Sequence, residues 1–158
     1  MSHPPLARAL GRIPSGLFVV TTVAEGGPLG FLGSFVQQVG FAPPTVAVAV
    51  ATGREHLAAM RASRCFGVSV LDAASKHAMP PFFGKLPAGV TSPFEVLTHR
   101  VSAHGPAVLT DALAWVVCKV TGEHAVGDHV VVFGEVVEGE LLREGEPSVH
   151  LRKNGLSY

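Results

Sequence analysis

Two long runs of β-branched residues in the C-terminal half constrain the fold of this 158-residue chain most strongly. They cover residues 114–123 and 129–139, and only the short segment 124–128 separates them. Valine-rich runs on either side of a turn sequence favour two antiparallel strands paired as a hairpin. The chain is therefore expected to contribute a long hairpin to a β-sheet.

Shorter runs of the same kind occur through the rest of the chain. Together with the hairpin they predict about seven strands, mostly antiparallel, and they cover residues 17–24, 29–41, 45–51, 65–71, 96–101 and, briefly, 148–152. Apolar spacing with proline or glycine boundaries predicts helices at 6–10, 55–63 and 75–83. Closure of the sheet would best protect so many strands from edge-to-edge pairing. The prediction is one mainly β domain over residues 1–158, a barrel or sandwich with roughly two or three peripheral helices.

The composition limits the kinds of partner. Hydrophobic residues make up 47% of the chain and charged residues only 15%, so a second copy or a ligand is expected to cover part of the surface. A formal net charge of zero gives no global field for nucleic acid or an anionic membrane. The sequence shows neither a signal-peptide pattern nor an apolar run of membrane-spanning length. A homodimer in the cytoplasm is the expectation.

The predicted strand at 29–41 has a polar interruption that is unusual for a core strand. Ser34, Gln37 and Gln38 stand among glycines, where a structural strand more often carries Val, Ile or Thr. Hydroxyl and amide groups beside glycines suit a flat, hydrogen-bonding ligand, because a missing Cβ lets another group approach the backbone. Valine and alanine then alternate over residues 46–51. The valine face is expected in the core, and the alanine face suits close approach by a helix, a second subunit or a planar ring.

Two loops follow that invite a ligand-binding interpretation. Thr52-Gly53-Arg54 joins a predicted strand to a predicted helix, and a helix N-terminus beside an arginine can bind phosphate. A solvated turn is the alternative for this segment. The Gly- and Pro-rich segment 84–93, next to Phe83 and containing Lys85, is interpreted either as a flap over a site or as a plain connector.

Several common kinds of site are excluded by the residue spacing. No phosphate-binding P-loop, nucleophile elbow or complete dinucleotide fingerprint occurs. The eight histidines lack metal-ligand spacing, and Cys65 and Cys118 stand in apolar runs typical of buried thiols, so no metal site is predicted. Gly127-Asp128-His129 is a stronger candidate for a functional site, because a turn between two rigid strands can aim an imidazole and fix its tautomer. An ordinary turn with a solvated histidine is the alternative.

Short sequence motifs occur in a characteristic order along nearly the whole chain. They cover residues 16–22, 30–44, 66–71, 82–85, 112–118 and 127–136. In this combination the chain resembles the flavin reductase-like proteins with an FMN-binding split barrel. That group includes flavoredoxins and the reductase components of two-component monooxygenases. The resemblance implies a split, antiparallel Greek-key β-barrel.

The resemblance also implies a set of site residues. It places the flavin ring at Ser34, Phe35, Gln37 and Gln38, and the phosphate at Thr52, Gly53, Arg54 and His56. Phe83 and Lys85 are implied to approach the flavin. His129 is implied to face the nicotinamide as the catalytic residue. The family often has Ser-x-Thr at the phosphate position, whereas this chain has Arg54-Glu55-His56. A charged group thus replaces neutral hydroxyls there.

The implied activity is NAD(P)H-dependent reduction of FMN or FAD, by hydride transfer to flavin N5. Because the cofactor supplies this chemistry, no catalytic triad is required. One alternative is an electron-transfer or non-catalytic FMN protein that retains its flavin, and another is a β-barrel interaction module without a cofactor. A partner monooxygenase is possible under the first interpretation. The choices between FMN and FAD and between NADH and NADPH stay open at this stage.

Overall fold

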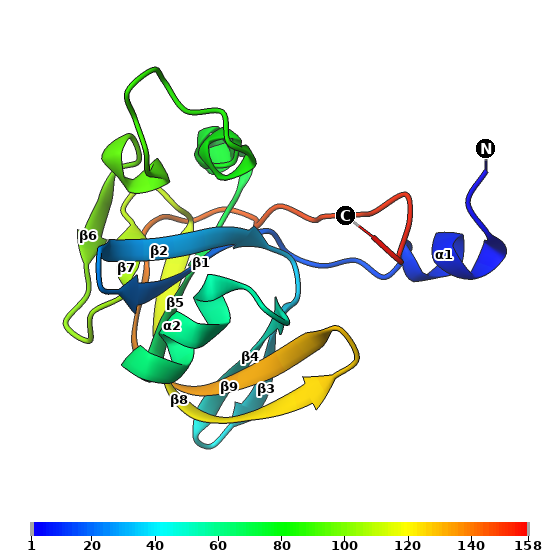
Figure 1. Cartoon of the computed structure of the whole chain (residues 1–158), viewed down its shortest axis with the longest axis horizontal. Coiled ribbons are helices and arrows are strands. Elements are labelled where there is room, and N and C mark those ends of the chain that lie inside the picture. The colour runs from blue at the N-terminus through cyan, green and yellow to red at the C-terminus, as the bar shows by residue number, and fades with distance from the viewer. Residues whose placement is uncertain (1, 158) are drawn as a thin grey trace.

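The computed structural model of the protein describes residues 2–157 and is dominated by one antiparallel sheet (Figure 1). Met1 and Tyr158, the ends of the predicted domain, lie outside the described residues. The elements in chain order are α1 (Pro5–Leu10), β1 (Phe18–Ala24), β2 (Gly27–Gly33), β3 (Val36–Phe41), β4 (Pro44–Ala51), α2 (Glu55–Ser63), β5 (Cys65–Val70), the 3₁₀ helices η1 (Ala73–Ala78), η2 (Pro80–Phe83) and η3 (Pro93–Glu95), then β6 (His99–Val101), β7 (Ala107–Leu109), β8 (Ala114–Val126) and β9 (His129–Leu141). The predicted mainly β, antiparallel fold with few helices is confirmed.

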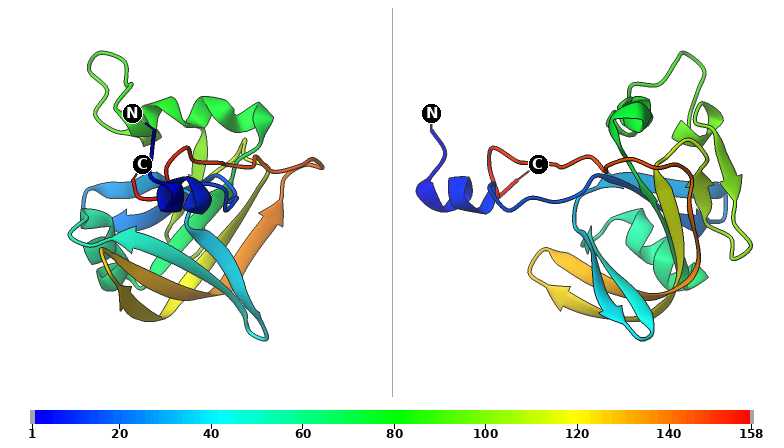
Figure 2. Two further views of the ribbon diagram at one scale, coloured as in Figure 1. Left: turned by 90° about the vertical axis from the view of Figure 1, so that its right-hand side faces the viewer. Right: turned by 180° about the vertical axis from the view of Figure 1, so that it is seen from behind.

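The main sheet has seven strands in the order β2-β1-β5-β8-β9-β4-β3, and β6 and β7 form a separate two-stranded sheet. Every strand pair is antiparallel. The main sheet curls strongly (Figure 2), but within residues 2–157 no strand pairing joins its edge strands β2 and β3. Only Ser34 and Phe35 connect these two strands. The chain therefore crosses from one edge of the curled sheet to the other at this junction.

The largest core cluster fills the inside of the curled sheet. Val46, Val48 and Val50 of β4 are at most 8% exposed, which confirms the predicted valine face. Leu57 and Met60 of α2 belong to the same cluster, so the helix packs its apolar side into the sheet. Burial of each such side chain contributes about 1.5–3 kcal/mol to stability relative to exposure. This packing fixes the start of α2 relative to the end of β4.

The predicted strand at 29–41 is wrong as a single element. β2 ends at Gly33 and β3 begins at Val36, and the two belong to opposite edges of the sheet. After the break, the Ala49 amide donates to the Phe35 carbonyl at 3.0 Å, next to the pairing of β3 with β4. The sequence does not signal the break, because both sides of it are extended.

Other segments also differ from the sequence predictions. The helix expected at 75–83 is two short 3₁₀ helices, because Asp72 caps η1 and Pro80-Pro81 start a new turn. The strand expected at 96–101 is reduced to β6, and β7 was not predicted. In place of a strand at 148–152, a single bridge joins His150 to Ser15. Nowhere in residues 2–157 does a helix combine the length and apolarity needed to cross a membrane.

The N-terminal helix α1 and the C-terminal segment lie side by side, extending away from the sheet (Figures 1 and 2). The His150 amide donates to the Ser15 carbonyl at 2.7 Å, and the Gly155 amide donates to the Ala7 carbonyl at 2.8 Å. A Cβ on Gly155 would lie 2.2 Å from the Cβ of Leu10, so this contact requires glycine. The two ends of the chain are thus held together.

Candidate functional site

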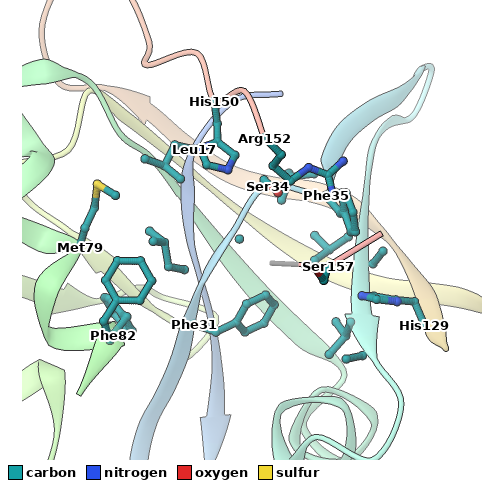
Figure 3. Close-up of a pocket in the computed structure, with 18 of the residues that line it drawn as sticks. Leu17, Phe31, Ser34, Phe35, Met79, Phe82, His129, His150, Arg152 and Ser157 are labelled. Atoms are coloured by element: carbon teal, nitrogen blue, oxygen red, sulfur yellow. The ribbon is translucent and has the colours of Figure 1, made fainter. Parts of the chain in front are cut away.

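A cavity of about 640 Å³ opens beside the β2–β3 junction. Its lining comes from residues 31–36, the end of β4 at 48–51, the side chains Met79 and Phe82, and the C-terminal segment 150–154. Figure 3 shows Met79 and Phe82 on one side of the view, Phe35 and His129 on the other, and His150 and Arg152 above. The cavity is of the size that protein sites for small-molecule cofactors usually have.

Ser34 is the buried polar side chain of the junction. The residue is 5% exposed, and its Oγ has no hydrogen-bond partner among the described residues. A buried hydroxyl without a partner costs about 1–3 kcal/mol. Because Ser34 lines the cavity, a ligand with a polar edge can supply the missing hydrogen bond.

Phe35 stands between two cavity residues from distant parts of the chain. The Arg152 guanidinium carbon lies 4.7 Å from the centroid of the Phe35 ring. The His129 ring approaches Phe35 edge-on, with centroids 5.6 Å apart and an interplanar angle of 68°. Both contacts are of the kinds in which aromatic rings gain stability beyond simple burial. The junction, the β8–β9 hairpin and the C-terminal segment therefore meet at one aromatic ring.

His129 begins β9 directly after the turn, and its side chain is 19% exposed. Its Nδ1 lies 2.7 Å from Oδ1 of Asp128. A carboxylate oxygen accepts, so Nδ1 carries the proton, and in the neutral ring Nε2 is the unprotonated nitrogen. The hydrogen bond from His129 lowers the pKa of Asp128. The Asp128 side chain is 94% exposed, so the pair orients the imidazole more than it stabilises the fold.

The β4–α2 junction supplies a second edge of the cavity. Ala49 and Ala51, two of the three alanines of the predicted alanine face, line the cavity together with Arg54. The Arg54 guanidinium carbon lies 5.9 Å from the Phe31 ring centroid. The side chain of Arg54, the N-cap residue of α2, makes no capping hydrogen bond, so N–H groups at this helix start can bind an anion. Thr52 and Gly53 are exposed in this turn without lining the cavity.

His56 lies behind this edge and does not line the cavity. Its Nε2 donates to the Gly30 carbonyl at 3.0 Å, which leaves Nδ1 buried without a partner among residues 2–157. Its ring also packs edge-on against Phe31, with centroids 5.0 Å apart. Burial lowers the pKa of His56, although the Gly30 hydrogen bond opposes the shift. The His56 ring thus supports Phe31, a residue of the cavity lining, without reaching the cavity itself.

Three other predicted site residues lie outside the cavity. Gln37 and Gln38 are exposed on β3, where their amides donate at 3.1 Å to the Gln38 and Gly40 carbonyls respectively. Gln37 lines a neighbouring, smaller hollow. Lys85 is exposed and does not line the cavity, whereas Phe83 lines it with 62% of its surface exposed.

The C-terminal segment is the part of the site that the sequence analysis missed. His150, Arg152 and Lys153 all line the cavity. Their spacing, three basic groups within four residues, is the signal that could have drawn attention to them. Their position depends on pairing with residues near the N-terminus, which the local sequence does not encode.

The cysteines and metal-ligand residues supply no further chemistry among the residues described. Both cysteines are buried, and burial raises the pKa of Cys118 to about 12, so its thiol is protonated near neutral pH. Within residues 2–157, no three His, Cys, Asp or Glu side chains gather as a metal site would need.

Comparisons with known proteins identify the family of this chain. The family described as flavin reductase like domain matches residues 10–155. Diflavin flavoprotein A 1 of Synechocystis is 32% identical over 155 residues, which are 97% of this chain and 27% of that protein. A putative diflavin flavoprotein A 3 of the same organism is 34% identical, over 96% of this chain and 25% of the relative. The chain thus spans about a quarter of the length of these curated relatives.

Solved structures agree in fold over most of both chains. Nitrilotriacetate monooxygenase component B from Mycobacterium thermoresistibile superposes with a TM-score of 0.82 at 29% identity, covering 91% of this chain and 79% of that one. An NADH:FAD oxidoreductase from Streptomyces globisporus gives the same TM-score at 26% identity, covering 96% and 92%. The chain thus shares its fold with both of these proteins over most of its length.

Proposed function

We propose, since the chain belongs to the flavin reductase-like domain family, that it binds FMN or FAD in the cavity and catalyses reduction of the flavin by NADH or NADPH. The observation that carries the proposal is Ser34, a residue of the cavity lining whose buried Oγ has no partner among the described residues. The names of similar structures, such as NADH:FAD oxidoreductase, support the reaction class.

The residues present fit a flavin. A planar ring with one polar edge matches a wall of aromatic rings and small alanines that carries one unsatisfied hydroxyl. Ser34 would bond the polar edge of the ring, while Phe31, Phe35 and Ala49 would contact its apolar surface. Arg54 and the uncapped start of α2 would hold the phosphate. Gln37, Gln38 and Lys85, all outside the cavity, have no assigned role in this arrangement.

A bound flavin supplies the redox chemistry, by accepting a hydride from reduced nicotinamide. The protein's own side chains would bind and orient the reactants and exclude water. His129 stands at the cavity with its ring braced by Phe35 and its Nδ1 proton directed to Asp128. This arrangement leaves Nε2 of the neutral ring to contact the nicotinamide. His129 is thus the residue proposed to position the hydride donor.

An electron-transfer flavoprotein that keeps its flavin is the second candidate. It is favoured by the relatives named diflavin flavoproteins, in which the matching region is about a quarter of a longer chain. Enclosure of the cavity by the C-terminal segment would also slow release of a bound ring. If the protein is of this second kind, the flavin stays bound during size-exclusion chromatography, and turnover of NADH and NADPH is negligible.

One experiment separates the candidates. Purified protein is mixed with FMN or FAD, and oxidation of NADH or NADPH is followed before and after size exclusion. A reductase accelerates oxidation when free flavin is added. An electron-transfer protein keeps its flavin without that activity, and a protein that binds no flavin contradicts both proposals.

Three further features stay predictions. A homodimer is expected from the low charged fraction, and light scattering on the full chain tests it. The cytoplasmic location and the partner monooxygenase are predictions that must be tested in the cell that makes the protein. The name nitrilotriacetate monooxygenase component B, carried by one similar structure, supports looking for such a partner.

A further inference from the structure

The charges around the cavity are strongly one-sided. Its lining includes the three cationic side chains Arg54, Arg152 and Lys153, and the histidines His3, His129 and His150. No aspartate or glutamate of residues 2–157 lines it, although the chain has 12 acidic and 12 basic residues. A cavity lined by charges of one sign concentrates ligands of the opposite sign. The ligand is therefore expected to be anionic.

Arg152 is the least exposed of the three cationic side chains that line the cavity. It is half-buried, and its guanidinium lies over the Phe35 ring at 4.7 Å. Its backbone is fixed, because its carbonyl accepts a hydrogen bond of 3.1 Å from Arg12 and the nearby His150 pairs with Ser15. No carboxylate of the described part of the chain forms an ion pair with it. A half-buried guanidinium without a carboxylate partner among residues 2–157 is poised to bind phosphate, which matches its planar fork of donors.

Arg152 and Arg54 contact different aromatic rings. Arg54 lies over Phe31 and Arg152 over Phe35, and Figure 3 shows the two phenylalanine rings at separate places around the cavity. FMN has one phosphate group, which would bind at the proposed phosphate site beside Arg54. Arg152, the cation at Phe35, is then available to a second anionic group. A dinucleotide provides one, because its diphosphate joins two nucleoside halves.

We propose that Arg152, assisted by Lys153, binds the diphosphate of a dinucleotide at the C-terminal side of the cavity. This inference rests on the proposed function and narrows the substrate class of the same site. The dinucleotide is either FAD or the reduced nicotinamide nucleotide, and both would present an ADP moiety to Arg152, which in NADPH also carries a 2′-phosphate. The C-terminal segment thus selects ligands that extend beyond a mononucleotide.

The test is equilibrium binding of ADP, FMN, FAD, NADH and NADPH to the full chain and its variants. Arg152→Met is expected to weaken ADP and at least one dinucleotide about tenfold, the usual range for a charge-assisted hydrogen bond, and FMN by less than about twofold. Arg152→Lys should lose less, because it keeps the charge. Arg8→Met is the matched control, since exposed Arg8 does not line the cavity. Loss of FAD binding identifies the flavin as the dinucleotide, and loss of NADH or NADPH binding identifies the reductant.

A structural role for Arg152 would give a different pattern. Equal weakening of FMN and dinucleotides would mean that Arg152 only supports Phe35, and it would overturn the inference. Unchanged binding of ADP and all dinucleotides would overturn it too. Salt dependence is a second readout, because removing a phosphate contact makes binding less sensitive to ionic strength. Should Arg152→Met not fold, Lys153→Met must give a smaller loss in the same direction, and no loss in that variant would overturn the inference.

The two proposals fail separately. Binding of ADP through Arg152 without any flavin binding would contradict the proposed function and keep this inference. Flavin binding and turnover that are insensitive to Arg152 would keep the function and overturn this inference. A protein that binds none of the five nucleotides contradicts both.

Discussion

The His129 ring meets the Phe35 ring edge-on, with centroids 5.6 Å apart, although 94 positions separate the two residues in the chain (129 − 35). The contact joins the turn of the β8–β9 hairpin to the break between β2 and β3. It therefore fixes the proposed nicotinamide-positioning residue against the proposed flavin wall.

Replacing Phe35 is expected to damage flavin binding. Phe35→Ala removes the ring that both His129 and Arg152 contact, and the loss of aromatic contact should weaken flavin affinity about tenfold. Fluorescence titration with FMN and FAD measures the effect. Phe41→Ala is the control, because Phe41 is 89% exposed and does not line the cavity. Equal affinities in the two variants would remove Phe35 from the site.

Ser34→Ala separates stability from binding. The change removes a buried hydroxyl that has no partner among the described residues, so the free energy of unfolding without ligand should stay constant or rise by up to about 1 kcal/mol. Flavin affinity should fall about tenfold, because the polar edge of the ring loses its hydrogen bond. Denaturant unfolding and flavin titration give the two values.

Ser102→Ala is the matched control for this prediction. Ser102 Oγ is also buried without a partner in the described part of the chain, and Ser102 does not line the cavity. It should reproduce the effect on stability and leave flavin affinity unchanged. If Ser34→Ala also left flavin affinity unchanged, Ser34 would no longer support the proposed function.

Asp128→Asn is expected to affect turnover more than flavin binding. Its carboxylate holds the Nδ1 proton of His129 at 2.7 Å, and an amide can present its N–H₂ group there and favour the other tautomer. We expect kcat to fall by about tenfold or less, because the pair is exposed, with flavin affinity unchanged. Asp111→Asn, which breaks the similar exposed pair with His77 outside the cavity, should leave kcat unchanged. Equal kinetics in both variants would contradict the role of Asp128.

His56 should make stability depend on pH. Burial lowers the pKa of His56 below the ordinary value of about 6.5 for a histidine, so near and below that pH the unfolded chain binds the proton more readily than the native protein. The free energy of unfolding therefore falls as the pH drops from about 7.5 to about 5.5. His56→Gln cannot titrate there and should show a weaker fall in Tm over the same range. An equal fall in the wild type and the variant would exclude His56 as the cause.

The sequence predicted those parts of the fold that local patterns determine. The β8–β9 hairpin follows from two valine-rich runs, and α2 begins at Glu55, as its spacing indicates. The break at Ser34 and Phe35 was not predictable, because an extended backbone continues on both sides and only the pairing partners differ.

The candidate site divides in the same way. Ser34, singled out as a polar interruption within a predicted strand, and Arg54 and His129, singled out beside predicted strand ends, all line the cavity. Gln37 and Gln38 lie outside it, since β3 runs along the opposite edge after the break. Arg152 reaches the cavity through contacts between the two ends of the chain, such as that between His150 and Ser15. Sequence patterns within either end carry no sign of that pairing.

Anaerobic mixing tests the central claim most directly. The purified chain is combined with FMN or FAD and with NADH or NADPH, and loss of the visible absorption of oxidised flavin is followed in time. We predict that the protein accelerates this loss with at least one pair of nucleotides, and that Phe35→Ala reduces the rate while Phe41→Ala does not. A rate equal to that of the nucleotides alone, with no flavin bound to the protein, would contradict the assignment of the cavity as a flavin site.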